Sequence, residues 1–331
     1  MWSTSLDTLI TFNIAENCRT SFHQSTATVL PHSNLRKLNL SFNKLRGPLP
    51  IPPSSLVDYN VSNNMLTREI PPLFCKPSSL SCLSLSNNNL SGMIPQCLGN
   101  FSDSLSMWDL RNNSLQGSIP QMCNKLNDVF SPWLGSLPKL KVLTLCCNGF
   151  LGVIGKPKKD LKYFPKLQII DLSYNHFTGE LPYHYMLNWN AMTEINLPNN
   201  ASYMDANWVY TLPNSYGSEY IYRYTITVAY KGVEIYYSAI QDFFAFIDLS
   251  SNKFEEEILE FIGNLKALHS LNLSNKILSG CIPTSLGDLS MIESLDLSRN
   301  NLSGEIPQQL NQLEFLAYFN VSHNNLTGLI S

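Results

Sequence analysis

The sequence is poor in charged residues and has no excess of either sign. Asp, Glu, Lys and Arg make up 14% of its 331 residues, and the formal net charge is -3. A nucleic-acid-binding face needs clustered basic side chains, so this composition argues against nucleic acid as a partner. No apolar run reaches the ~18 residues of a membrane-spanning helix. Residues 1–18 also lack the basic start and long apolar core of a secretory signal.

The motifs of catalysis are missing as well. There is no glycine-rich phosphate loop and no kinase signature. The six histidines, at positions 23, 32, 176, 184, 269 and 323, are scattered and do not have metal-ligand spacing. The adjacent Cys146 and Cys147 have no further ligands at a suitable spacing. We therefore expect no enzymatic activity, no cofactor and no metal.

An internal repeat occupies most of the chain. Its consensus has apolar residues at offsets 0, 3 and 5 from the first residue, Asn at 8, Gly at 12 and Pro at 15; Arg68 and Glu256 replace the Gly in two copies. This L-x-x-L-x-L-x-x-N-x-L core is the signature of a leucine-rich repeat. One copy cannot bury its own apolar side, so copies stack. The predicted fold is an α/β solenoid with a parallel β-sheet on its concave face. The ten copies begin at Leu35, Leu56, Leu80, Leu105, Leu140, Leu167, Phe244, Leu268, Ile292 and Leu316.

The Asn at offset 8 interrupts an otherwise apolar inward series. Loops inside a stack carry backbone donors and acceptors that need partners, and an Asn side chain offers a carbonyl and an NH2 group. Lys276 stands in this slot in one repeat and cannot accept a hydrogen bond, so that repeat is expected to be weaker unless Asn275 takes the slot. The predicted structural ladder consists of Asn43, Asn64, Asn88, Asn113, Asn148, Asn175, Asn252, Asn300 and Asn324.

The second half of each repeat carries a resemblance to a known family. The segments "NLSGEIPQQL", "NNLSGMIPQCLGN" and "HFTGELP" resemble the plant-type extracellular leucine-rich repeat, in which L-x-G-x-I-P forms a second short strand. Between the repeats at Leu167 and Phe244 the spacing is 77 residues, against 24 later in the chain. The insert, which ends in "TVAYKGVEIYYSAIQDFFAFIDLSSNKFEEEI", resembles the island domain of plant receptor-like proteins of the Cf disease-resistance type.

The resemblance implies a plant-type leucine-rich-repeat superhelix with an inserted island domain, acting as a non-catalytic ectodomain. Such an ectodomain binds an extracellular peptide or protein in plant defence and signals through coreceptor and adaptor receptor-like kinases. It lies on the extracellular face of the plasma membrane, attached only through a C-terminal helix that is absent from this chain. Family members also carry a signal peptide and terminal caps, so we interpret the chain as a fragment. Two alternatives stay open: a secreted protein resembling polygalacturonase inhibitors, which bind cell-wall-degrading enzymes, and a non-functional truncated product.

Repeat spacing divides the chain into four regions. These are a degenerate N-terminal segment (1–34), leucine-rich repeats (35–182), the island (183–243) and four truncated C-terminal repeats (244–331). The sequence after Cys123, "NKLNDVFSPWLGSL", matches only the second half of a repeat. We interpret this as a half-repeat lost near Asn124 and expect a gap in the strand ladder there. In the island, "YIYRYTITVAY", a turn at Lys231 and Gly232, and "VEIYY" predict a β-hairpin.

Cysteines and sequons indicate the compartment. Cys75 and Cys97 lie late in consecutive repeats, so a disulfide between neighbouring coils is predicted if their Cα atoms lie within ~7 Å. Two separate thiols are the alternative. Ten N-x-S/T sequons fit a secreted glycoprotein, although N-L-S is partly built into the repeat. The predicted glycosylation sites are Asn39, Asn60, Asn89, Asn100, Asn112, Asn200, Asn272, Asn301, Asn320 and Asn325.

Function is expected on the outward side of the strands. Offsets 1, 2, 4, 6 and 7 point outward, beside the same offsets of coils ~4.8 Å away. Aromatic, Arg and acidic side chains there suit a protein or peptide ligand, or they simply solubilise the sheet. The island tyrosines either cover a small satellite core or lean over the groove. The candidate ligand contacts are Asp171, Tyr174, Tyr220, Tyr222, Tyr224, Phe246, Asp248, His269, Glu293, Arg299, Tyr318 and His323.

Overall fold

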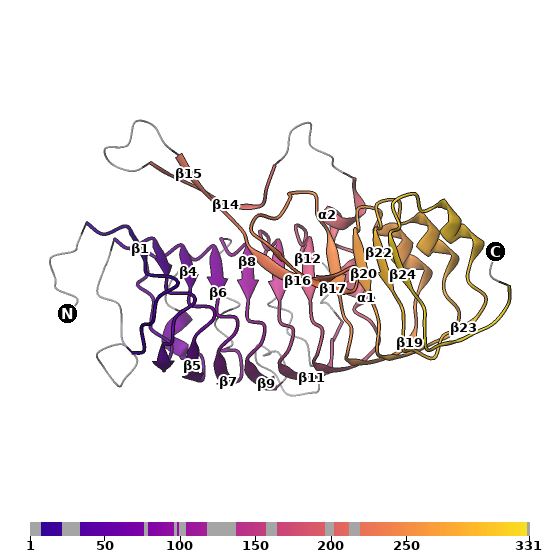
Figure 1. Ribbon diagram of the computed structural model, residues 1–331, viewed down its shortest axis with the longest axis horizontal. Coiled ribbons are helices and arrows are strands. Elements are labelled where there is room, and N and C mark those ends of the chain that lie inside the picture. The colour runs from indigo at the N-terminus through magenta and orange to yellow at the C-terminus, as the bar shows by residue number, and fades with distance from the viewer. Residues whose placement is uncertain are drawn as a thin grey trace.

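The computed structural model describes residues 8–21, 34–75, 79–95, 98, 104–117, 137–156, 164–195, 202–211 and 219–329. Across these residues the chain winds into an elongated solenoid whose coils follow one another from the N-terminal end to the C-terminal end (Figure 1). Each turn of the solenoid, here called a coil, is one sequence repeat. The predicted solenoid of stacked parallel strands is therefore confirmed.

One strand from each coil enters an eleven-stranded parallel sheet, here called the main sheet. The strands follow chain order and lie in register, so that Leu295 of one coil pairs with Phe319 of the next. In the interior coils the middle residue, at offset 3, points into the core, and offsets 2 and 4 form the outer face. The strands are β1 (Thr11–Asn13), β2 (Lys37–Asn39), β4 (Asp58–Asn60), β6 (Cys82–Ser84), β8 (Met107–Asp109), β10 (Val142–Thr144), β12 (Ile169–Asp171), β18 (Phe246–Asp248), β20 (Ser270–Asn272), β22 (Ser294–Asp296) and β24 (Tyr318–Asn320).

Strand β1 lies in the segment before residue 35, which we expected to be degenerate. Leu9, Phe12, Ile14 and Asn17 occupy offsets 0, 3, 5 and 8 of an additional coil. β1 pairs with β2 over three residues, and the Nδ2 group of Asn43 donates to the carbonyl of Ile14 at 2.8 Å. The repeat therefore begins one coil earlier than predicted.

The Asn side chains at offset 8 form a column inside the solenoid. The Nδ2 group of Asn300 donates to the carbonyls of Leu273 in the preceding coil (2.9 Å) and Leu297 in its own coil (3.0 Å). Its Oδ1 atom accepts the Leu278 N–H of the preceding coil at 3.2 Å. Each amide thus ties its coil to the coil before it. The same three bonds recur at Asn43, Asn64, Asn88, Asn113, Asn148, Asn175, Asn252 and Asn324.

Lys276 occupies the slot that Asn fills in the other coils. Its Nζ atom donates to the Leu249 carbonyl, the bond that an Asn would make, and lies 4.3 Å from the ring centroid of Phe254. Burial lowers the pKa of this amine well below its ordinary value. The Phe254 N–H has no side-chain acceptor among the described residues, because an ammonium group cannot supply one. Asn275 does not take the slot, since its Nδ2 group donates to Ser251 Oγ at 3.1 Å.

The second halves of the coils form a second parallel layer, along the lower edge of Figure 1. The chain then returns through short 3-10 turns that stack closely. A Cβ atom on Gly263 would lie 2.3 Å from the Ser285 carbonyl oxygen of the next coil, so only glycine fits there. The strands are β3 (Arg46–Gly47), β5 (Met65–Arg68), β7 (Asn89–Gly92), β9 (Ser114–Gly117), β11 (Gly149–Val153), β13 (His176–Gly179), β19 (Lys253–Glu257) and β21 (Ile277–Ser279), with β23 (Ser303–Gly304) and β25 (Asn325–Leu326) as a separate pair. The turns are η1 (Pro72–Cys75), η4 (Glu260–Asn264), η5 (Thr284–Asp288) and η6 (Gln308–Gln312).

The main sheet is continuous where a gap was predicted. Leu143 of β10 pairs with Trp108 of β8. The Leu110 N–H also donates to the Thr144 carbonyl at 2.9 Å. The predicted gap in the strand ladder is therefore wrong, because the longer connection between these coils still leaves their strands adjacent. Residues 118–136, which include Asn124, lie outside the described residues, and the loss of a half-repeat stays a prediction.

Residues 183–243, here called the island segment, interrupt the coils between β12 and β18, which nevertheless pair directly. The predicted hairpin is present in residues 226–237, and its turn residues Lys231 (φ +52°) and Gly232 (φ +78°) have the positive φ angles of a type I′ turn. Tyr220 and Tyr222 lie instead on β15, which pairs with β14. The elements are α1 (Tyr183–Met186), α2 (Asn190–Thr193), β14 (Asp205–Thr211), β15 (Glu219–Arg223), β16 (Ile226–Tyr230) and β17 (Val233–Tyr237).

Replacing Lys276 with Asn should stabilise the fold. The amide would supply the missing acceptor for the Phe254 N–H and remove a buried amine, with an expected gain of about 1–3 kcal/mol in the free energy of unfolding. Denaturant titration at neutral pH measures it. Asn252→Ala, in the adjoining coil, is the matched control and should lose a similar amount. If Lys276→Asn leaves the stability unchanged or lowers it, the hydrogen bond that the Asn Oδ1 atom accepts from the preceding coil does not stabilise the fold.

Candidate ligand-binding groove

The hairpin formed by β16 and β17 of the island segment lies across the outer face of the main sheet (Figure 1). Tyr224, Ile226, Val228 and Tyr230 alternate along the chain, so they share one side of it, and all four are buried. They form a second hydrophobic cluster with outer-face residues of the sheet. The central part of the outer face is therefore covered by the chain itself. The sheet residues in this cluster are Cys82, Met107, Val142, Ile169 and Phe246.

Polar contacts fix the start of this hairpin on the sheet. The Arg111 guanidinium donates to the backbone carbonyl of Thr227 and to its Oγ1 atom, the latter at 3.1 Å. The Tyr224 hydroxyl is hydrogen-bonded to Ser106 Oγ. These bonds join residues more than 100 positions apart in the sequence. They fix the position of the hairpin along the axis of the solenoid.

A second set of contacts, here called the latch, holds the hairpin tip. The Tyr230 hydroxyl and the Lys231 ammonium each donate to Oε2 of Glu293 at 2.7 Å. The turn also rests against the last coil, since a Cβ atom on Gly232 would lie 3.0 Å from the ring of Tyr318. The hairpin tip therefore contacts Glu293, which precedes β22, and Tyr318 of β24.

A groove of about 310 Å³ lies beside the latched tip, over the outer face of the last coils. Lys231 and Gly232 border it on the hairpin side, and Asp248 and Asp296 lie on the sheet side. Hydroxyl and amide groups make up most of the rest of its lining. Because the sheet backbone is already paired, a ligand here is recognised through side chains. The other lining side chains that matter chemically are Tyr174, Ser250, Ser270, Asn272, Ser274, Asn275, Ser294, Ser298, Arg299 and Tyr318.

The acidic groups of the groove also have a structural task. The residue at offset 4 is repeatedly Asn or Asp, and its Oδ1 atom accepts the N–H two residues later. For Asp248 the donor is Ser250 at 2.8 Å, and for Asp296 it is Ser298 at 2.9 Å. One carboxylate oxygen of each Asp therefore caps the end of its own strand by accepting this N–H. The column also includes Asn39, Asn60, Asp171, Asn272 and Asn320.

Asp248 is the most perturbed acid of the groove. It is buried, and its Oδ2 atom accepts a hydrogen bond from Asn272 Nδ2 at 3.0 Å. Burial raises the pKa of Asp248 to about 7, and the neighbouring carboxylate of Asp171 adds to the increase, while the Ser250 bonds oppose it. Near neutral pH, Asp248 can therefore present either a carboxylate or a hydrogen-bond donor.

The groove brings together four predicted ligand contacts, Tyr174, Asp248, Arg299 and Tyr318. Glu293 forms the latch, and His323 is exposed in the final coil outside the groove. The side chains of Tyr220 and Tyr222 lie outside the described residues. Sequence reasoning missed the serine hydroxyls of the groove, for which the S-x-N segment that recurs after most strands of the main sheet was an available signal.

Besides Asp248 in the groove and His269, three predicted contacts are buried, and these three need correction. Tyr224 and Phe246 belong to the second hydrophobic cluster, because the hairpin covers the position where they meet. Asp171 is buried at the end of β12, where it accepts hydrogen bonds from the Ser173 N–H (3.0 Å) and hydroxyl (2.6 Å). In this arrangement none of the three offers its side chain to a ligand. The island tyrosines were predicted either to cover a small satellite core or to lean over the groove. Tyr224 and Tyr230 are buried in such a core.

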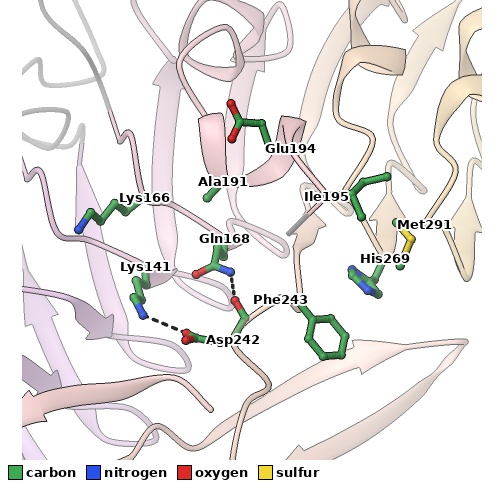
Figure 2. A pocket seen from close by; sticks show the side chains of 11 residues that line it. Lys141, Lys166, Gln168, Ala191, Glu194, Ile195, Asp242, Phe243, His269 and Met291 are labelled. Carbon is green, nitrogen blue, oxygen red and sulfur yellow. Dashed lines mark hydrogen bonds and ion pairs between the residues drawn. The ribbon is translucent and has the colours of Figure 1, made fainter. Parts of the chain in front are cut away.

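His269 lines a separate pocket of about 240 Å³, shown in Figure 2, where the two ends of the island segment meet the sheet. Lys141 Nζ is 3.0 Å from Asp242 Oδ1, and the Gln168 side chain donates to the Asp242 carbonyl. Figure 2 shows Phe243 and His269 on the side of the pocket opposite Lys141. Burial lowers the pKa of His269, although the Glu293 carboxylate opposes this. The polar contacts here fasten the base of the island segment.

The predicted glycosylation sites differ in their exposure. Asn89, Asn112, Asn301 and Asn325 are exposed, whereas Asn39, Asn60, Asn272 and Asn320 are half-buried strand-end caps. Asn100, Asn200 and Cys97 lie outside the described residues, so the disulfide from Cys75 stays a prediction. Within the described ranges, no three His, Cys, Asp or Glu side chains are grouped as metal ligands. The helices found in those ranges are too short or too polar to span a bilayer.

Replacing Asp248 with Asn should flatten the dependence of stability on pH. Because the pKa of Asp248 is about 7 in the fold and ~3.9 when unfolded, only the folded state holds this proton between those values. The wild-type protein should therefore lose stability as pH rises through this window, by up to about 1.4 kcal/mol per pH unit. Denaturant titrations across the window measure this. Parallel curves for the two proteins would contradict it. The substitution creates an Asn-Leu-Ser sequon, so both proteins are made in a host without N-glycosylation.

Removing the Glu293 carboxylate should free the hairpin tip. In Glu293→Ala, two charge-assisted bonds are lost, and the backbone amides of residues 230–233 should exchange hydrogen about tenfold faster. Hydrogen–deuterium exchange with mass spectrometry measures this rate. Glu314→Ala, at an exposed position, is the control and should leave the tip unchanged. Equal protection in both variants would mean that the hydrophobic cluster alone holds the tip.

Known proteins share both the repeat and the fold. The Leucine Rich Repeat family model matches residues 34–56, 79–101, 166–185 and 291–313. The ectodomain of the Arabidopsis receptor kinase HAESA, solved with an N-terminally extended IDA peptide hormone, has a TM-score of 0.59 and 28% identity, over 98% of this chain and 51% of that chain. The plant peptide hormone receptor RGFR1, solved with RGF2, has a TM-score of 0.67 over 97% of this chain and 40% of that chain. At 23% identity, the second likeness shows the fold alone.

Two Arabidopsis thaliana proteins are similar over most of this sequence. Receptor like protein 27 is 40% identical over 305 residues, and Receptor like protein 22 is 39% identical over 302 residues, each covering 81% of this chain. The chain spans 36% and 38% of their respective lengths. Repeat pattern, coil geometry and identity agree: the chain is built of leucine-rich repeats, and over most of its length it is similar to plant receptor-like proteins.

Proposed function

We propose that this chain is a non-catalytic ligand-recognition region of a plant cell-surface receptor-like protein, and that it binds an extracellular peptide or protein in the groove beside the hairpin tip. One observation carries the proposal: the island segment covers the central outer face and leaves a polar groove over the last coils. Tyr174, Arg299 and Tyr318 border that groove. Tyr and Arg are the side chains that dominate protein-binding surfaces.

Partners follow from the same reasoning. With no catalytic motif of its own, the chain would signal through coreceptor and adaptor receptor-like kinases on the extracellular face of the plasma membrane, in a defence response. Support comes from the HAESA ectodomain, which was solved with a peptide hormone. A further HAESA structure, which includes the co-receptor SERK1, shares this fold with a TM-score of 0.54 and 23% identity.

A library of random peptides tests the groove, because it samples many candidate ligands at once. Random twelve-residue peptides displayed on phage are selected against the chain, and their affinities are then measured for variants. Ser274→Trp fills the groove and should weaken binding at least tenfold. Ser62→Trp is the matched control, because both serine hydroxyls donate to the Asn two residues before them, at 2.7 and 2.8 Å, and Ser62 lies far from the groove. Peptides that bind both variants equally well, or a library that yields no binder, would contradict the proposal.

A further inference from the structure

The backbone turns in the same way at offset 7 of every coil. This residue follows the strand and has φ between +50° and +58° in eleven coils. Such a left-handed conformation is unfavourable for most residues, and Asn tolerates it better than others. Asn accordingly fills the position in several coils. The complete column is Glu16, Phe42, Asn63, Asn87, Asn112, Cys147, Tyr174, Ser251, Asn275, Arg299 and His323.

Beside the groove, two members of this column are large side chains without a structural task. Tyr174 is 62% exposed, and it makes no side-chain hydrogen bond or ring contact with a described residue. Arg299 is exposed and likewise makes no side-chain hydrogen bond or ion pair with one. Both line the groove. Asn275, in a coil between them, is the residue type that the backbone prefers here.

The fold therefore gains nothing from Tyr174 and Arg299 that would offset their unfavourable backbone conformation. Residues held in sparsely populated conformations are concentrated at functional sites. We propose, on the basis of the function proposed above, that Tyr174 and Arg299 are the specificity-determining contacts of the groove. They recognise a ligand from two points on its rim.

Their spacing defines the ligand class. Tyr174 and Arg299 belong to coils that are three strands apart, from β12 to β22. Three strand spacings of ~4.8 Å amount to about 14 Å, the length of about four residues of extended chain at ~3.3 Å each. The guanidinium of Arg299 pairs best with a carboxylate, and the Tyr174 ring favours an aromatic or aliphatic group. The ligand is thus an extended peptide with an acidic residue about four positions from an apolar one.

Substitution by Asn separates binding from stability. Tyr174→Asn and Arg299→Asn should each raise the thermal midpoint by about 1–3 °C, because Asn relieves the backbone, and should each weaken the selected peptides about tenfold or more. Phe42→Asn is the matched control. Phe42 has the same conformation, is 53% exposed and does not line the groove, so this variant should gain stability and keep its affinity.

The outcomes are distinguishable. If peptides lose affinity for Ser274→Trp but not for the two Asn variants, the groove binds the ligand and the rim assignment is overturned. If neither set of variants weakens binding, or no peptide is selected, the proposed function fails and the rim assignment fails with it. If Tyr174→Asn and Arg299→Asn lower the thermal midpoint, these side chains stabilise the fold and the inference is overturned. Selected sequences without the acidic and apolar pair would overturn the ligand class.

Discussion

Hydrogen bonds from an inward amide, present in every described coil except that of Lys276, fix the register of this solenoid. The loop that follows each strand is buried against its neighbours, so its donors and acceptors have no water to bind. Asn300 satisfies two carbonyls and one N–H at once, and two of these three groups belong to a neighbouring part of the chain. A shift of one coil by a single residue would break the two bonds that join Asn300 to the preceding coil. The amide thus aligns every other position of the repeat.

Because register is fixed, a given offset has the same task in most coils. Offset 4 ends the strand by accepting an N–H two residues on, as Asp296 does from Ser298. Offset 7 turns left-handed in every coil. A side chain that suits its task, such as Asn275, carries no information about function. A side chain that suits it badly, makes no contact in return and also lines the groove, such as Tyr174, does. The regularity of the scaffold is therefore what makes its exceptions informative.

The repeat, the ladder and the Lys231 turn were predictable because each depends on residues close together in the sequence. The coil at Leu9 was predictable in principle, since Phe12 and Asn17 keep their offsets. The position of the island segment was not, because Arg111 and Thr227 are 116 residues apart and nothing local pairs them. The error at Phe246 has the same origin. Its outward direction was inferred correctly, but whether an outer face meets solvent or a covering hairpin is a tertiary property.

The island segment determines which part of the outer face is open. A hairpin that buries Tyr224, Ile226 and Val228 must lie on matching apolar residues, and the outer face offers these only from β6 to β18. On β20 and β22, the next two strands, the outer face changes to Ser, Asn and Asp, which cannot bury the hairpin but can hydrogen-bond a polar partner. The hairpin therefore stops where apolar residues stop, and its tip is held there by Glu293 instead. The groove is the direct consequence of this change in chemistry along a single sheet face.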